Sequence, residues 1–313
     1  MAVNEVDVVV VGGGAAGLSA ALVLARARRN ILVIDAGSPR NAPAAHMHGF
    51  LSRDGFPPAE LLTVARAEIT GYGGKFVTGT VTDVAPTGTS GFSLSVSDGQ
   101  PITARRLLVA TGLRDELPTI PGLADRWARD VLHCPYCHGY EVRDQRLAVL
   151  GSTLEAVKFT QIVRQWSYDV VLFAAPGTLS TSARHQLRAR SIGIVEDEVT
   201  RIVVENDQLR GVEVGGGRVF ARDAVFVPPR FVPNNHLLTT LNCPVDDAGW
   251  VVADSTGRTS VAGVWVAGNV VNPRAQVITA AGEGSAAAIA INADLVEEDI
   301  RDAVRNLDLK HLV

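Results

Sequence analysis

The residues with the clearest potential for chemistry are two closely spaced cysteines. They lie in the run His133-Cys134-Pro135-Tyr136-Cys137-His138. Two thiols at this spacing can close a small disulfide, and at the start of a helix the backbone amides stabilise a thiolate. The flanking histidines supply imidazoles that titrate near neutral pH and can accept a thiol proton. The run therefore predicts a thiol–disulfide exchange centre with Cys134, Cys137 and His138 as its catalytic residues.

The same run has two alternative interpretations, a zinc site and a purely structural disulfide. His133, Cys134, Cys137 and His138 are all possible zinc ligands. A closed tetrahedral site usually takes two ligand pairs from separate segments, however, and no second Cys/His pair occurs in the sequence. The remaining cysteine, Cys243, stands alone and is expected in a core. We therefore expect no metal at this motif.

A glycine-rich turn near the start of the sequence has the form of a dinucleotide-binding fingerprint. A β-branched run over residues 8–11 predicts a buried parallel strand, and Gly12-Gly13-Gly14-Ala15-Ala16-Gly17 follows it directly. In this fingerprint Gly12 allows the tight turn, and Gly14 lets the backbone approach a pyrophosphate. Gly17 lets the following helix pack closely on the strand, with its first amides facing the phosphates.

An acidic residue completes the fingerprint. After the helix predicted over 18–28, a second strand over 31–34 ends at Asp35. A carboxylate at this position can accept hydrogen bonds from ribose hydroxyls and would repel a 2′-phosphate. The segment therefore predicts a site for FAD or NAD.

Two later strands end in small residues that favour FAD. One runs from Arg105 into Ala110-Thr111-Gly112, and the other runs from Val264 into Gly268-Asn269. Gln276 and a helix of small residues over 279–294 follow the second turn. Small residues at the carboxyl ends of strands let a flat ring or a ribityl chain lie against the backbone. The FAD domain is therefore expected to draw on both ends of the chain.

A second strand–turn–helix–strand unit lies in the middle of the sequence. Its predicted strands cover 147–150 and 170–173, and its turn covers 151–156. Thr153 stands where a glycine would approach a pyrophosphate, and no arginine pair follows the second strand to grip a 2′-phosphate. NADPH binding is therefore possible but doubtful. Prolines near both crossings divide the chain into an FAD domain (1–115 and 246–313) and an inserted domain (116–245) that carries the cysteines.

Length and charge limit the class of protein. The 313 residues suggest two domains, and a net charge of -4 gives no reason to expect a nucleic-acid partner. The apolar run over 6–25 follows acidic residues and is broken by glycines, which argues against a membrane span or a signal. Three cysteines make a poor disulfide framework and fit the cytoplasm.

Taken together, these motifs resemble the low-molecular-weight thioredoxin reductase family over nearly the whole chain. The resemblance rests on the order of the first glycine turn, Ala110-Thr111-Gly112, the cysteine pair and a final Ala-Gly-Asn…Gln…Ala-Ala-Gly-Glu-Gly run. It implies two Rossmann-like domains of the three-layer ββα type, the second inserted in the first, and a homodimer. It also implies that FAD binds at the matching positions, which are Gly12, Gly14, Ala15, Ala16, Gly17, Asp35, Ala36, His48, Ala110, Thr111, Gly112, Gly268, Asn269, Gln276 and Val277.

The chain departs from the reductases at several places, one of which is the missing arginine pair noted above. His138 replaces the aspartate after the second cysteine, Asn269 replaces another aspartate, and the segment 45–55 with His46 and His48 is unlike a standard reductase. In the segment 45–55 and in His138 the chain looks like the dithiol oxidases that close disulfides in gliotoxin- and holomycin-type natural products. That likeness implies that Cys134 meets the substrate, Cys137 faces the flavin and His138 is the general base.

Three functions follow as expectations. The first is an FAD-dependent dithiol oxidase that acts on a small-molecule dithiol and passes electrons to oxygen. The second is an NADPH-dependent reductase of a thioredoxin-like protein, with electrons moving in the other direction. The third is an FAD-binding redox sensor without turnover. The identity of the dithiol, and whether His46 and His48 line its pocket, are left open.

Overall fold

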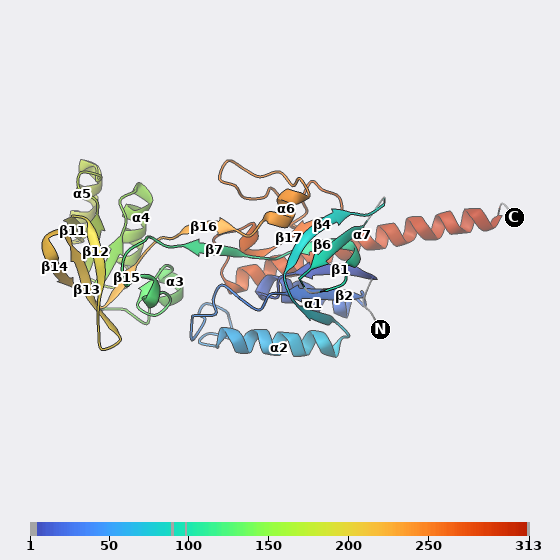
Figure 1. Cartoon of the computed structure of the whole chain (residues 1–313), viewed down its shortest axis with the longest axis horizontal. Helices are drawn as coiled ribbons and strands as arrows, with labels where there is room; N and C mark the ends of the chain where they lie inside the picture. Colours follow the sequence, from blue (N-terminus) through green and yellow to red (C-terminus); the bar gives the residue numbers. More distant parts are fainter. Residues whose placement is uncertain (1–4, 89–90, 98, 312–313) are drawn as a thin grey trace.

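The computed structural model describes residues 5–88, 91–97 and 99–311 and has two lobes joined by a narrow connection (Figure 1). The lobe with both chain ends is built on a seven-stranded sheet in the order β3-β2-β1-β6-β5-β4, with β17 paired to β6. Its strands are β1 (Glu5–Val11), β2 (Ile31–Asp35), β3 (Lys75–Thr78), β4 (Val81–Pro86), β5 (Phe92–Val96), β6 (Ile102–Val109) and β17 (Val264–Val266).

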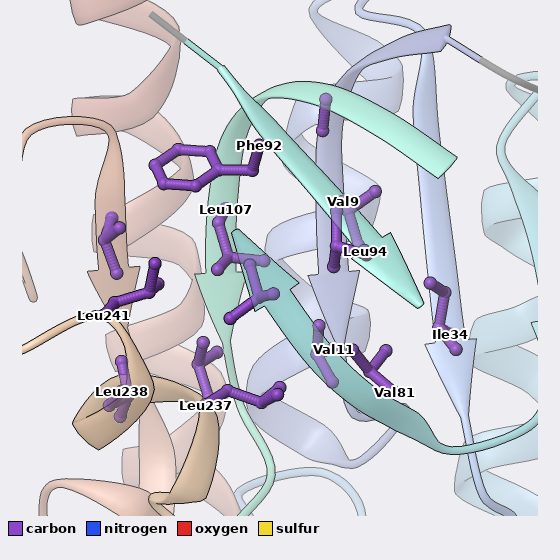
Figure 2. Close-up of a cluster of buried hydrophobic side chains, with 14 of the residues drawn as sticks. Val9, Val11, Ile34, Val81, Phe92, Leu94, Leu107, Leu237, Leu238 and Leu241 are labelled. Carbon is purple, nitrogen blue, oxygen red and sulfur yellow. The ribbon is translucent and has the colours of Figure 1, made fainter. Parts of the chain in front are cut away.

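Strand β1 explains why this sheet is covered on both faces. Residues 8–11 of this strand are apolar in succession, so alternate side chains enter two different cores. Val8 and Val10 pack toward the helices α1 (Ala15–Arg26), α2 (Pro58–Gly71) and α7 (Val277–His311). Val9 and Val11 pack on the opposite side, in a cluster with residues of β4, β5 and the short helix α6 (His236–Thr240) (Figure 2).

Helix α7 is longer than the sequence pattern indicated. The predicted helix over 279–294 and the charged tail after it form one continuous helix of 35 residues. Its first half packs so closely on α1 that a Cβ at Gly284 would lie 2.0 Å from the carbonyl oxygen of Ala16. Its C-terminal end extends away from the rest of the lobe (Figure 1). No helix of the described residues is both long and apolar enough to cross a membrane.

The inserted lobe has three layers. A parallel sheet in the order β11-β10-β9-β15-β8 lies between helices on one face and an antiparallel sheet, β12-β13-β14, on the other. The parallel strands are β8 (Val131–Leu132), β9 (Leu147–Leu150), β10 (Val170–Ala174), β11 (Gly193–Glu196) and β15 (Ala224–Phe226). The other elements are α3 (Pro135–His138), α4 (Leu154–Val163), α5 (Thr181–Ala189), β12 (Val199–Glu205), β13 (Gln208–Val214) and β14 (Arg218–Ala221).

Two short antiparallel strands, β7 (Leu113–Glu116) and β16 (Arg230–Pro233), link the lobes, and we call this pair the connector. Strand β7 carries the chain out of the first lobe, and β16 carries it back. Leu237, Leu238, Leu241 and Cys243, which we assigned to the inserted domain, are buried in the core of the first lobe. The boundary at 245 is therefore corrected to the connector, because this leucine-rich segment covers the first sheet.

Candidate active site

The first glycine turn leaves the start of α1 open for an anion. Gly12 has φ +105°, and a Cβ there would lie 2.4 Å from the carbonyl oxygen of Ala110, so only glycine fits. Gly14 caps α1 without a side-chain hydrogen bond, and a Cβ at Gly14 would meet nothing within 4 Å. No side chain therefore caps the first amides of the helix, including those of Ala15 and Ala16, which leaves them available to a pyrophosphate.

Asp35 ends β2 beside this turn, as the fingerprint predicts. Its carboxylate accepts a hydrogen bond of 3.0 Å from the backbone amide of Gly13 and pairs with Arg66 of α2. The Arg66 guanidinium also lies 5.0 Å from the Phe76 ring. A carboxylate has further lone pairs for ribose hydroxyls. Ala36, the next residue, is exposed at the same edge. Sequence reasoning missed Arg66, because α2 shows no motif.

The two small-residue turns lie at the same end of the sheet, because β6 and β17 are parallel neighbours. Gly268 has φ +76°, and a Cβ there would lie 2.9 Å from that of Ala16, so the second turn lies beside the start of α1. Gly112 has φ +70° and open space at its Cβ position. Thr111 instead turns its hydroxyl to the carbonyl of Asn234, 2.7 Å away, and so secures the chain as it returns from the connector.

The Asn269 side chain explains why an amide replaces the family aspartate. Its Nδ2 donates to the backbone carbonyls of Asn272 and Ala275, at 2.9 Å and 3.0 Å. A carboxylate has no proton to donate to these oxygens and would repel them. The Oδ1 atom accepts a 3.4 Å hydrogen bond from Arg40. Gln276, just before Val277 and α7, lies close to Gly49 of the segment 45–55.

The cysteine motif forms a disulfide at the start of α3. Cys134 and Cys137 are bonded to each other, and Cys134 is the N-terminal cap of this helix. The Cys137 amide donates to the Cys134 sulfur at 3.2 Å. When the disulfide is reduced, this donor stabilises a thiolate at Cys134. Among the described residues no group of three or more His, Cys, Asp or Glu side chains is arranged to hold a metal ion.

His138, at the end of α3, has a half-buried imidazole ring. Burial lowers its pKa below the usual 6.5, although nearby Glu141 opposes the shift. The neutral ring is therefore the main form at pH 7. The part of the chain that the structure describes offers the His138 side chain no hydrogen-bond partner, so both ring nitrogens are free for proton transfer.

The segment 45–55 reaches across to the cysteine domain through His48. Its Nε2 lies 3.4 Å from a carboxylate oxygen of Glu141, three residues after His138, and its Nδ1 lies 3.4 Å from Asp54. The Asp54 carboxylate accepts a 2.8 Å hydrogen bond from the Gly49 amide, which lowers the pKa of Asp54. The structure therefore brings His48 to the boundary between the lobes. His46 is exposed.

In the strand–turn–helix unit of the inserted lobe, side chains of the turn over 151–156 accept hydrogen bonds from nearby backbone amides. Thr153 caps α4, its hydroxyl accepting a 3.1 Å hydrogen bond from the Ala156 amide. The Ser152 hydroxyl accepts a 2.8 Å hydrogen bond from the Ala175 amide. Arg184 of α5 forms a bidentate pair with Glu196, at 2.9 Å and 2.7 Å. The Ala156 and Ala175 amides and the Arg184 guanidinium are thus already paired within the inserted lobe.

Comparison with known proteins places the chain in a family. The profile of the family "Pyridine nucleotide-disulphide oxidoreductase" matches residues 6–284. This chain belongs to that family. The family implies FAD, and the open start of α1 with Asp35 beside it fits that cofactor. NADPH also occurs in the family.

Individual relatives agree with this assignment. The crystal structure of HlmI is 53% identical in sequence, with a TM-score of 0.95 over 98% of this chain and 97% of that one. A putative thioredoxin reductase TrxB from Bacillus anthracis is 32% identical, with a TM-score of 0.89 over 94% and 99%. The resemblance to the thioredoxin reductase family, and the fold of two dinucleotide-binding domains, are confirmed.

Curated relatives match over different lengths. "Thioredoxin reductase tcpT" of Claviceps purpurea (strain 20.1) is 40% identical over 151 residues, which is 47% of this chain and 47% of that protein. That alignment spans about half the length of the relative. "Thioredoxin reductase sirT" of Leptosphaeria maculans is 29% identical over 94% of this chain and 95% of its own. The chain is therefore an oxidoreductase of the thioredoxin reductase-like type.

Proposed function

We propose that the protein is an FAD-dependent dithiol oxidase that forms a disulfide in a small-molecule dithiol and passes the electrons to oxygen. The observation that carries this proposal is the contrast between the two helix starts. The start of α1 is open to a pyrophosphate, whereas that of α4 is capped by Thr153. One dinucleotide site and one redox disulfide are enough for an oxidase, while a reductase also needs a nicotinamide site. The sequence likeness to dithiol oxidases supports the same choice.

The cysteines carry the exchange in two steps. A substrate thiolate attacks the Cys134 sulfur, which forms a mixed disulfide and releases Cys137 as a thiolate. The second substrate thiolate then attacks the substrate sulfur of that mixed disulfide, which closes the product disulfide and expels Cys134. The Cys137 amide, 3.2 Å from the Cys134 sulfur, stabilises this leaving thiolate. The enzyme now holds two thiols and has gained two electrons.

His138 handles the protons of these steps. Its neutral ring accepts the proton of the attacking substrate thiol, because its lowered pKa keeps it unprotonated at pH 7. Bound FAD supplies the two-electron acceptor that restores the disulfide, and oxygen takes the electrons from it. Gly14 and the first amides of α1 would hold the pyrophosphate, and Asp35 would hold the ribose.

We also propose that the protein is a homodimer that pairs through α7. The outer side of this helix carries an apolar stripe whose side chains are 41–62% exposed, made of Ile289, Val296, Ile300, Val304 and Leu307. An amphipathic helix normally buries such a stripe. A second copy would cover it with an identical stripe. Ile300→Asp is expected to convert a dimer to a monomer in light scattering, and a wild-type monomer would contradict the pairing.

Oxygen uptake with dithiothreitol, with and without NADPH, tests the proposed function. The oxidase consumes oxygen without nicotinamide, and Cys134→Ser abolishes this uptake. The competing outcome is the reductase function, which the names of several relatives favour. Strict dependence on NADPH would establish that function and refute the oxidase. Uptake that persists in Cys134→Ser would show that the disulfide is not on the electron path.

A further inference from the structure

One arginine of the first lobe is anchored on both strands of the connector. Arg40 lies in the loop after β2, and its Nε and Nη2 donate to the Asp115 carboxylate at 2.8 Å and 2.7 Å. Its guanidinium carbon lies 5.1 Å from the centre of the Phe231 ring. Asp115 and Phe231 are partners across the two strands, so the guanidinium contacts both strands at the same level. Planar bidentate pairing fixes its orientation.

The same guanidinium also contacts both the turn after β17, in the first lobe, and the segment that carries the disulfide. Its Nη1 donates to Oδ1 of Asn269, at 3.4 Å, in the turn after β17. Its Nη2 lies 3.3 Å from Nε2 of His133, the residue directly before Cys134. Asn269 and His133 are more than a hundred residues apart in the sequence. One side chain thus contacts the first lobe, the connector and the redox segment.

Donors and acceptors match at both contacts. The Asn269 amide donates its Nδ2 to two backbone carbonyls, which leaves its oxygen to face Arg40. His133 is packed between Trp127, stacked at 5.9 Å, and Phe231, edge-on at 5.9 Å. Burial, together with the charge of Arg40, lowers the pKa of His133 to about 4. The ring is therefore neutral at pH 7, and the tautomer protonated at Nδ1 accepts the arginine proton at Nε2.

We propose that Arg40 is a positioning residue that holds the inserted lobe in a fixed orientation to the first lobe. In this orientation the segment of the Cys134–Cys137 disulfide stays beside the turn after β17 that carries Asn269. Within the described residues Arg40 forms no hydrogen bond with either sulfur, and it acts through His133 and Asn269. This positioning is needed because the connector is a two-stranded ribbon of four residues per strand, which is marginally stable alone. The proposal rests on the proposed function only in assuming that the disulfide exchanges electrons with FAD.

The test compares a double variant, in which the side chains at 40 and 115 are both uncharged, with a control variant in the same connector. Arg40→Gln/Asp115→Asn removes both charges together, so that no buried carboxylate is left unpaired. Arg230→Gln is the control, because it removes an exposed ion pair with Glu116 from the same connector and touches neither His133 nor Asn269. Both proteins are mixed anaerobically with dithiothreitol, and two quantities are followed: free cysteine thiols by alkylation, and the flavin by its absorbance.

The two steps are expected to separate in the double variant. Dithiothreitol reduces the disulfide by two electrons at a rate within about twofold of wild type, because exchange needs only an accessible disulfide. Transfer of those electrons to FAD is expected to slow by about 10–100-fold, since a misplacement on the order of 1 Å costs that much. Protein with two free thiols and oxidised flavin therefore accumulates. Arg230→Gln behaves as wild type.

Small-angle scattering of the FAD-free proteins gives a readout independent of turnover. The double variant is expected to show a broader distribution of distances between the lobes than wild type and Arg230→Gln. Equal flavin reduction in the double variant and the control, or an equal slowing of both steps, overturns the positioning role. If wild-type flavin is not reduced by dithiols at all, the proposed function fails, and the scattering alone then decides whether Arg40 braces the lobes.

Discussion

A single methyl group at Gly284 tests how α7 holds the end of α1 that faces the cofactor. A Cβ there would lie 2.0 Å from the backbone oxygen of Ala16 and 2.8 Å from its carbonyl carbon. Neither atom can rotate away, so the two helices must separate by about 1 Å. Overpacking of this kind costs about 3 kcal/mol, and the better helix propensity of alanine returns about 1 kcal/mol. Gly284→Ala is therefore expected to lower the free energy of unfolding by about 2 kcal/mol.

Gly282 provides a matched control in the same helix. A Cβ at Gly282 meets nothing within 4 Å, so Gly282→Ala gains only helix propensity and is expected to stabilise by about 0.5–1 kcal/mol. Urea unfolding of the FAD-free proteins measures both effects. Because Ala16 lies in the first turn of α1, Gly284→Ala is also expected to weaken FAD binding about tenfold, which corresponds to about 1.4 kcal/mol. Equal urea midpoints for the two variants would refute the close packing of α7 on α1.

Three further substitutions test the site itself. Asn269→Asp is expected to destabilise the protein by about 2 kcal/mol at pH 7, because the side chain can no longer donate to Asn272 and Ala275. This loss should shrink in urea titrations at acidic pH, where the carboxyl regains a proton, and a loss that is constant with pH would contradict the assigned hydrogen bonds. His138→Gln is expected to slow dithiol oxidation about 10²-fold. The wild-type rate should fall at acidic pH as His138 becomes protonated, with a pKa below 6.5, and this fall should be absent in the variant. An unchanged pH–rate profile would exclude the base role. Thr153→Ala is expected to cost about 1 kcal/mol in thermal unfolding while oxygen uptake stays unchanged, and lost uptake would implicate α4 in the reaction.

The sequence predicted those parts of the site whose roles depend on local spacing. Gly12, Gly14 and Asp35 take their roles from a strand, a turn and a helix that are adjacent along the chain, so a pattern of about thirty residues is enough. The disulfide between Cys134 and Cys137 closes within one turn and needs no distant partner. Local geometry of this kind follows from residue type alone.

The remaining parts depend on packing between segments far apart in the sequence. Arg40 lies in a loop without periodicity, and its partners are 75 and 229 residues away. Nothing near it indicates that the chain will bring Asp115 and Asn269 to its two sides. The early return to the first lobe was missed for a similar reason, since α6 has only five residues and is too short to show a helical period.

The paired strands of the connector also have a consequence for the modularity of the chain. Glu116 and Arg230 lie opposite each other in the ribbon, so the inserted lobe begins and ends at neighbouring points. The lobe also has its own two buried clusters, one on each face of its parallel sheet. When the ends of a segment are adjacent, the segment can be excised or transplanted at a small entropic cost of loop closure. Residues 117–229 therefore form a cassette that is expected to fold as a separate polypeptide and to accept grafting into a related scaffold.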